Sequence, residues 1–174
     1  MYTSLGEPVQ ESFDIMIKPD TVIDSTLRSK ILIVRTTDFK SMTPYKTAYL
    51  DSTGRYGAPV RSFGTFCLVA DTVAPTIVPL GYKDSLTLNP KTVKELAFGV
   101  KDELSGLRSF KLFVPKQWVL TDFNLKKEKM VVLPAEIGSL RLPSGHYPIR
   151  VEAIDNKENK AEFKGVIKWE LAGN

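Results

Sequence analysis

Residues 146–155 read "HYPIRVEAID", and their apolar side chains recur at every second position. Tyr147, Ile149, Val151 and Ala153 occupy one side of this period, and the residues between them are mostly charged. Successive side chains of a β-strand point to opposite faces of a sheet, so a period of two indicates a strand with one buried face. This stretch therefore predicts an antiparallel sheet that covers a hydrophobic core on one side.

The same alternation returns along the second part of the chain, between proline, glycine and aspartate residues that favour turns. Short strands with regular turn signals are typical of an antiparallel β-sandwich of the immunoglobulin or fibronectin kind. We expect seven strands there, at residues 76–82, 94–102, 107–114, 118–123, 129–135, 146–155 and 161–171.

The first part of the chain carries a similar but weaker pattern. Residues 31–34 read "ILIV", as a strand buried on both faces would, and the runs 12–19 and 62–70 also read as strands. Between them, residues 45–60 read as a strand followed by a turn. We expect a second, smaller β-sandwich here, and the sequence leaves open whether it is complete.

Residues 71–75, "DTVAP", separate the two patterns. Pro75 lacks a backbone N–H and disfavours helix in the residue before it, so a stiff, extended connection is expected. The sequence thus predicts an all-β chain of two tandem antiparallel β-sandwich (Ig-like) modules. We place the modules at residues 1–70 and 76–174, with the linker at 71–75.

Composition excludes several classes of protein. Apolar residues make up 43% and charged residues 25%, which is ordinary for a soluble globular chain. No run approaches the roughly 18 to 20 apolar residues of a membrane helix, so a membrane-spanning protein is not expected. Residues 1–14 do not read as a signal peptide. The net charge of +4 is spread along the chain, and residues 125–130 read as a solvated basic loop, so nucleic acid is not an expected partner.

The sequence offers no constellation suited to catalysis. Zinc hydrolases typically need three protein ligands, usually with two or three histidines, and this chain has the single histidine His146. The single cysteine, Cys67, lies in the apolar run "TFCLVA" and is expected to be a buried, inert thiol. We therefore expect the chain not to be an enzyme.

Acidic residues gather at three predicted turns. In a sandwich of alternating strands these turns lie at one end, so Asp71, Asp102, Glu103 and Asp155 are expected to come together. One interpretation is a calcium site, because Ca²⁺ takes several oxygen ligands. The other is that each aspartate accepts backbone N–H bonds within its own turn. The cofactor expectation is therefore none, with calcium as the alternative.

Aromatic residues raise a second binding hypothesis. Trp118, Phe113 and Phe123 are candidates for a flat platform on which a sugar ring stacks. Phe113 and Phe123 fall out of register with the inward residues near them, so we expect these two to be the more exposed. The alternative is ordinary core packing, since a sandwich buries most of its aromatic side chains.

Three motifs resemble those of bacterial immunoglobulin-like repeats. They are "DTVAP" at 71–75, "DELSGL" at 102–107 and "GHYPIRVEAIDNKEN" at 145–159. Their order is similar to the non-catalytic region that follows the peptidase domain in lysostaphin-like zinc endopeptidases of Gram-negative bacteria. The resemblance covers residues 60–170 well and the earlier part loosely. It implies an exported parent that is periplasmic, secreted or on the cell surface and cuts cell-wall peptides.

Two departures limit this resemblance. The zinc-binding histidines of the peptidase are absent, so the chain is expected to be either a fragment of such an enzyme or an independent protein with the same accessory modules. Glu158 stands where the repeats often carry glycine, which weakens the claim that a tight left-handed turn is required at that position.

The leading functional hypothesis is a non-catalytic accessory or spacer module pair of an exported bacterial protein. Its partner would be the parent's own peptidase domain or another exported protein. The alternative is a carbohydrate- or peptidoglycan-binding module that uses an exposed aromatic face. Fold alone does not decide between them.

Overall fold

The computed structural model describes residues 8–82 and 85–170, and the predicted all-β class is confirmed. The chain divides into two compact units, Met1–Val73 and Ala74–Asn174, which we describe one at a time. Residues 71–75 belong to no strand. Within the described ranges, no helix has the length and apolar character needed to cross a membrane.

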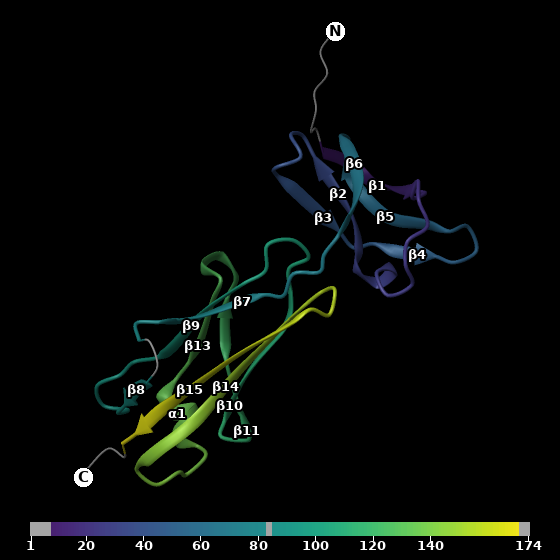
Figure 1. Ribbon diagram of the computed structural model, residues 1–174. Coiled ribbons are helices and arrows are strands. Elements are labelled where there is room, and N and C mark those ends of the chain that lie inside the picture. Colours follow the sequence, from purple (N-terminus) through teal and green to yellow (C-terminus); the bar gives the residue numbers. More distant parts are fainter. Residues whose placement is uncertain (1–7, 83–84, 171–174) are drawn as a thin grey trace. The chain divides into compact units, whose positions relative to one another are not determined.

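The first unit contains two three-stranded antiparallel sheets (Figure 1). One sheet has the order β1-β5-β4, and the other has the order β3-β2-β6. The strands are β1 (Pro8–Ile17), β2 (Ile31–Thr36), β3 (Met42–Tyr45), β4 (Ala48–Leu50), β5 (Arg55–Ser62) and β6 (Thr65–Ala70), with a 3-10 turn, η1 (Arg28–Lys30), before β2.

The core of the first unit lies between its two sheets. The central strand β2 is flanked by β3 and β6 and is buried from Ile31 to Val34, as the continuous apolar run predicted. Across from it, Tyr56 and Ala58 on β5 point inward, and half-buried residues such as Ile15 on β1 surround them. A small core made of few fully buried side chains results.

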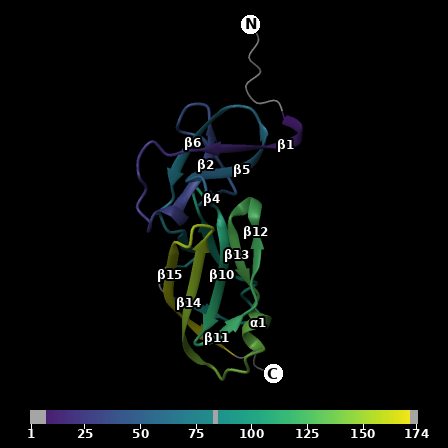
Figure 2. The same ribbon diagram turned by 90° about the vertical axis from the view of Figure 1, so that its right-hand side faces the viewer.

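The second unit is a sandwich of a five-stranded and a four-stranded sheet. The first has the order β11-β10-β14-β15-β8, and the second has the order β12-β13-β9-β7. Figure 2 shows β14 beside β10 and β12 beside β13. The strands are β7 (Thr76–Leu80), β8 (Ser85–Leu88), β9 (Leu96–Lys101), β10 (Leu107–Val114), β11 (Gln117–Val119), β12 (Asp122–Asn124), β13 (Lys129–Val132), β14 (Gly145–Asp155) and β15 (Lys160–Trp169).

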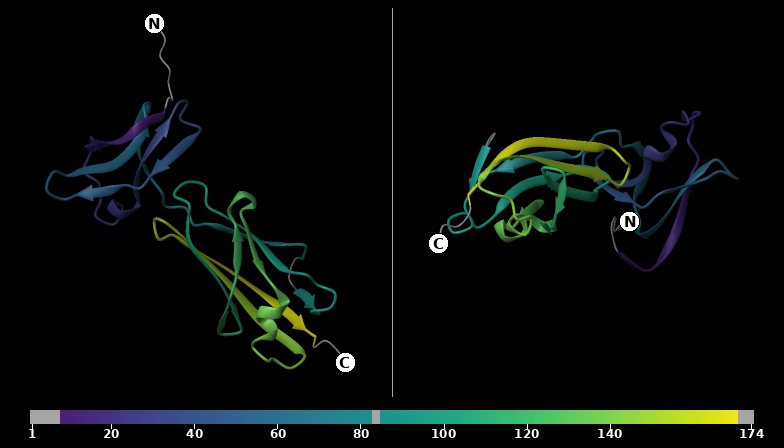
Figure 3. Two further views of the ribbon diagram at one scale, coloured as in Figure 1. Left: turned by 180° about the vertical axis from the view of Figure 1, so that it is seen from behind. Right: turned by 90° about the horizontal axis from the view of Figure 1, so that it is seen from below.

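The predicted alternation places the core of this unit correctly. On β14, Ile149, Val151 and Ala153 are buried while the residues between them are not. The neighbouring strand β15 buries Ile167 and Trp169 toward the same core. Figure 3 shows the long hairpin that these two strands form from two further directions.

The second unit differs from the prediction in three places. The expected strand at 118–123 is two strands in different sheets, β11 and β12, because the chain crosses between the sheets at Leu120 and Thr121. Strand β8 was not predicted, and it pairs in parallel with β15 while the other pairings are antiparallel. A short helix, α1 (Pro134–Gly138), follows β13, with Pro134 in its first turn, where a missing N–H costs nothing.

Candidate functional site

The strand register places a row of side chains across the outer face of the five-stranded sheet. Trp118 on β11 lies directly opposite Phe113 on β10, and Phe113 lies directly opposite Arg150 on β14. Arg150 in turn is opposite Lys164 on β15. Residues directly opposite one another share a face of the sheet, so these four side chains form one continuous row. We call this row the aromatic–basic row.

Trp118 is the exposed aromatic end of the row. Its neighbours alternate as in a half-buried strand: Val119 points into the core and is buried, whereas 54% of Trp118 is exposed. The turn at Pro115 and Lys116 sets this register by joining β10 to β11 as a tight hairpin. A large indole surface is therefore held in the solvent by a rigid strand, and not by a loop.

Phe113 is half-buried because a cation covers part of its ring. The guanidinium carbon of Arg150 lies 4.6 Å from the ring centroid, within the range of a cation–π contact. This contact fixes the planar guanidinium beside the aromatic surface. Phe113 was expected to be one of the more exposed aromatics. It faces outward in the register but is half-buried, and Trp118 is the more exposed ring.

The expectation that Phe123 is exposed is wrong. Phe123 lies on β12 in the other sheet, is half-buried, and packs against the core of the unit. Its ring stacks on Phe110 with centroids 4.6 Å apart and an interplanar angle of 29°. Val119 is the inward residue of β11, and Phe123 lies four positions further along the chain, so Phe123 is on the inward side of the alternation.

Carboxylates line the next row of the same outer face. Glu152 on β14 is directly opposite Glu162 on β15, and like charges in this position repel. Arg150 offsets this repulsion, because its Nη1 lies 2.7 Å from Glu152 Oε1 and 3.6 Å from Glu162 Oε1. Lys164 adds a contact of 3.0 Å to Glu162 Oε2. The outer face thus offers hydrogen-bond acceptors beside the aromatic surface.

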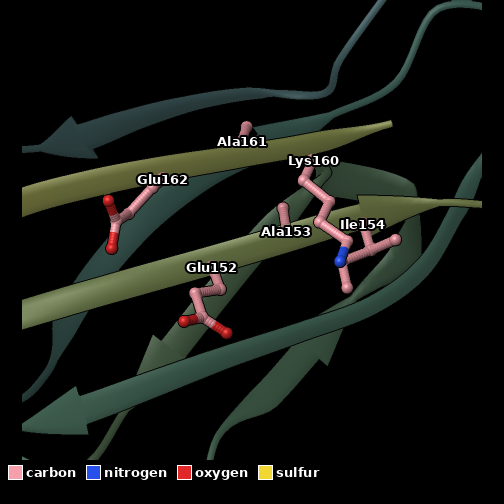
Figure 4. A pocket seen from close by; sticks show the side chains of 6 residues that line it. All are labelled: Glu152, Ala153, Ile154, Lys160, Ala161 and Glu162. Carbon is pink, nitrogen blue, oxygen red and sulfur yellow. The ribbon is translucent and has the colours of Figure 1, made fainter. Parts of the chain in front are cut away.

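A shallow cavity of about 290 Å³ adjoins these carboxylates. It lies along the β14–β15 hairpin and is lined by Glu152, Ile154, Lys160 and Glu162, with Ala153 and Ala161 between them. Figure 4 shows the Glu152 and Glu162 carboxylates on the same side of the strand pair. The cavity extends the polar part of the outer face toward the end of the hairpin.

The acidic motif at 102–106 is a turn held by its own aspartate. Asp102 Oδ2 accepts hydrogen bonds from Gly106 N at 2.7 Å and from Leu104 N at 3.2 Å. Gly106 has φ +79°, a left-handed conformation that glycine adopts without a steric penalty. The spacing D-x-L-S-G therefore describes a structural turn.

The motif that ends β14 is also a turn held by its own aspartate. Asp155 has no exposed surface and accepts bonds from Lys157 N at 2.7 Å, Asn159 N at 2.8 Å and Asn159 Nδ2 at 2.6 Å. Asn156 Nδ2 then donates to the carbonyls of Ser105 and Gly106, at 2.8 and 3.0 Å, which ties this turn to the turn of Asp102.

These ties bring two of the predicted acidic residues together within the second unit. Carboxylate oxygens of Asp102 and Asp155 lie within 4.8 Å of one another. Glu103 is instead an exposed side chain paired with Lys101 at 3.0 Å, and this hydrogen bond raises the pKa of the Lys101 amine. In the first unit, Asp71 N donates to Lys30 O at 2.9 Å, and Asp71 Oδ1 accepts from Val73 N at 3.3 Å.

The turn hydrogen bonds give each of these aspartates a structural role within its own turn. Calcium binding by Asp71, Asp102, Glu103 and Asp155 stays a prediction, which a comparison of melting temperatures with millimolar calcium and with a chelator tests.

The structure corrects the inference drawn at Glu158. Its φ is +64°, so the left-handed turn that the motif implies is present even though the residue is not glycine. Glu158 N donates to Asp155 O at 3.3 Å, and Arg108 Nη1 lies 2.8 Å from Glu158 Oε1. The hydrogen bonds of Asp155 enforce this turn against the conformational preference of the side chain.

The remaining candidates lie apart from the aromatic–basic row. His146 is exposed on β14 and directly opposite Lys168. Cys67, on β6 of the first unit, is half-buried, less enclosed than its apolar run predicted, because β6 is an edge strand of its sheet. Two structural features were not predicted from the sequence: the position of Arg150 over Phe113, and the enclosed hydroxyl of Tyr56. Alternation signals that Arg150 points outward, but only the strand pairing shows which ring it meets.

No known family profile matches the chain, and no curated protein matches it. Among solved structures, it is similar to the endo-β-1,4-mannanase from Thermotoga petrophila, with 15% identity and a TM-score of 0.44. That match covers 59% of this chain and only 21% of the mannanase. It is also similar to the fibronectin(III)-like modules of Clostridium thermocellum CbhA, with 13% identity and a TM-score of 0.42 over 94% of this chain and 88% of that one. Both TM-scores lie below 0.5, so the architecture given above rests on the sheets of this chain alone.

Proposed function

We propose that this chain is a non-catalytic accessory pair of β-sandwich modules whose second unit binds a glycan through the aromatic–basic row. The observation that carries the proposal is the exposed indole of Trp118, held directly opposite Phe113 on a rigid sheet. An isolated exposed apolar side chain is common, but an indole in register with a ring and a guanidinium is a shaped surface.

The chemistry of this face suits a polyhydroxylated ligand. The indole supplies a flat apolar surface for one face of a sugar ring. Arg150 and the neighbouring Glu152 and Glu162 supply donors and acceptors for hydroxyl groups. Binding sites of this kind combine an apolar surface with a few fixed polar groups that orient the ligand.

The wider role is an accessory one in an exported bacterial protein. The motifs at 71–75, 102–107 and 145–159 support this proposal through their resemblance to modules that follow a lysostaphin-like peptidase domain. In that setting the modules position the peptidase or another exported partner at the cell wall. Export, the peptidase partner and the absence of catalysis in this chain are parts of the same proposal.

A glycan titration tests the proposal. Soluble polysaccharides and cell-wall fragments are added to the full chain while tryptophan fluorescence is recorded. We expect a saturable change for at least one glycan and a loss of affinity of about tenfold or more in Trp118→Ala, the range of a central aromatic contact. Leu125→Ala is the matched control, because Leu125 is also highly exposed but lies outside the row. If no glycan of the panel binds saturably, the glycan-binding part of the proposal is wrong and only the spacer role remains.

A further inference from the structure

One edge strand of the first unit lacks the features that usually stop a sheet from pairing with another chain. The edge of a sheet presents unpaired N–H and C=O groups, and charges, prolines or a very short strand normally protect it. In the described part of the chain, β3 contains Pro44 and β7 contains Pro79. Strand β1 carries Glu11 and Asp14, and β4, β8, β11 and β12 have only three or four residues.

Strand β6 is the exception. It lies at the edge of its sheet beside β2, and its six residues, "TFCLVA", include no charge and no proline. Its register with β2 runs without interruption from Thr65 to Ala70, so no bulge bends this edge away from an incoming strand. Of the edge strands described, β6 is therefore the one most open to pairing with a further strand.

Hydrogen bonds on either side of β2 show which backbone groups of β6 point to the open side. In an antiparallel pair, successive residues direct their N–H and C=O groups alternately toward the partner strand and away from it. Asp71 N, directly after β6, donates to Lys30 O at 2.9 Å, so odd-numbered residues of β6 point toward β2. Ile33 lies opposite Leu68 but donates its N–H to Thr47 Oγ1 at 2.8 Å, beyond β3. Even-numbered residues of β6 therefore point away from β2.

The even-numbered residues of β6 are Phe66, Leu68 and Ala70, and we call them the β6 edge. They are spaced symmetrically about Leu68. A second copy of β6, related by a two-fold axis perpendicular to the sheet at Leu68, runs antiparallel and keeps its inward face on the same side. Leu68 then lies opposite its own copy, and Phe66 lies opposite Ala70 of the second copy. Each of these pairs exchanges two hydrogen bonds, so the whole edge is satisfied.

We propose that β6 pairs with β6 of a second copy of this chain, antiparallel and centred on Leu68. The pairing joins two three-stranded sheets into one continuous sheet. A second copy suits this edge because the edge is complementary to itself, and because a strand without charges places no like charges opposite each other. Only one strand of each copy takes part, so the interface is small and the dimer depends on concentration. The proposal does not depend on glycan binding by the aromatic–basic row.

Sedimentation equilibrium of the full chain from micromolar to millimolar concentration tests the dimer. We expect the apparent mass to rise from that of the monomer toward twice that value. Ala70→Pro removes one N–H of the β6 edge in each copy, at an edge position where proline is tolerated. It should lower the association constant about fivefold or more, because the two-fold axis repeats the lost hydrogen bond. Ala70→Ser keeps the N–H and is the matched control, which should dimerise as the wild type does.

Two results of this experiment overturn the proposal. One is a constant monomer mass at every concentration, including the case in which the monomer binds an unrelated extended peptide instead. The other is an association constant that Ala70→Pro leaves unchanged.

A cysteine pair tests the register without changing Ala70. In the proposed ladder, Cys67 lies directly opposite position 69 of the second copy, as a non-hydrogen-bonded pair. Cα atoms of such a pair are about 4.5 Å apart, within the range that a disulfide spans. Val69→Cys should therefore give covalent dimers under mild oxidation, at least about fivefold more than the wild type. Thr43→Cys, on the edge strand β3 that contains Pro44, is the control. Equal cross-linking of Val69→Cys and either the wild type or Thr43→Cys overturns the proposed pairing.

Discussion

The two units share a plan of two facing sheets, but their cores differ in depth. The second unit buries large side chains completely, among them Phe98, Leu112 and Met130. The first unit is shorter, and most of the apolar residues around its core are only half-buried. Its buried cluster consists of Ile31, Ile33, Tyr56 and Ala58.

This difference explains what each unit can hold. A shorter chain buries a smaller fraction of its surface on folding, so burial of apolar groups contributes less to its free energy of unfolding. A cavity of the first unit lies beside Tyr56, whereas the second unit presents its candidate ligand groups on the outer face of its larger sheet. We expect the first unit to unfold at the lower denaturant concentration.

The largest test compares one phenylalanine in each core. Phe98→Ala should destabilise the second unit by about 3–5 kcal/mol, because Phe98 is fully buried and packs edge-on against Tyr82 and Phe163. Phe66→Ala should cost the first unit clearly less, since Phe66 is half-buried. Both tryptophans lie in the second unit, so urea unfolding followed by tryptophan fluorescence reports on that unit, and far-ultraviolet circular dichroism reports on both. Equal losses would contradict the difference in core depth.

A second test compares two turn aspartates. Asp155→Ala should destabilise the second unit by about 2–3 kcal/mol, because it leaves three partly buried N–H donors without their charged acceptor. In the first unit, Asp38 accepts from Lys40 N and Ser41 N at 3.0 and 2.8 Å but is exposed, so Asp38→Ala should cost much less. The same denaturation curves measure both losses. Asp155→Asn keeps one carbonyl acceptor, so its free energy of unfolding should lie between those of the wild type and of Asp155→Ala.

Alkaline pH should affect both units through one tyrosine in each whose hydroxyl is buried. Burial raises the pKa of Tyr56 and of Tyr82 above the ordinary value of 10.0. The folded state then holds the proton more tightly than the unfolded state, so the stabilising contribution is full below pH 10 and falls as pH rises above it. We expect unfolding free energy measured between pH 8 and 11 to fall above pH 10. Tyr82→Phe should flatten this fall in the tryptophan-monitored transition, and an unchanged slope would mean that Tyr82 is accessible to solvent.

The smallest test concerns one left-handed residue in each unit. Phe39 and Glu158 have φ values of +58° and +64°, which are unfavourable for residues other than glycine. Phe39→Gly should raise stability by up to about 1 kcal/mol. Glu158→Gly should gain slightly less, because it also removes an exposed ion pair with Arg108 that contributes little. A loss of stability in either variant would show that the contacts of the original side chain stabilise the fold by more than its left-handed backbone conformation destabilises it.

The sequence predicted the fold where one face of a strand is buried along its length. The alternation on β10, β14 and β15 specified both strand and register, because a period of two leaves a single choice of inward face. It failed for residues 118–123, where two three-residue strands belong to different sheets and no period can be counted. Strand β8 is too short to give a periodic signal.

The candidate sites follow the same division. Trp118 and Phe113 were candidates by residue type, but the register was taken to expose Phe113 and Phe123, whereas Trp118 is the exposed ring. The turns at one end of the sandwich pointed to Asp102 and Asp155, together with Asp71 and Glu103. The Glu158 turn was misjudged because the motif's glycine is absent, although the bonds to Asp155 hold the same conformation. The cavity beside Tyr56 left no trace in the sequence, because an unpartnered hydroxyl is a property of packing between distant segments.

The parallel pairing of β15 with β8 has a mechanical consequence. Tension applied between the start of β8 and the end of β15 pulls two parallel strands past each other lengthwise. The four registered pairs from Val166–Ser85 to Trp169–Leu88 then carry the load together, in shear, so they cannot open one after another as the rungs of an unzipping hairpin do. This pair of strands therefore resists a lengthwise pull on its two ends more strongly than a hairpin that is peeled from one end.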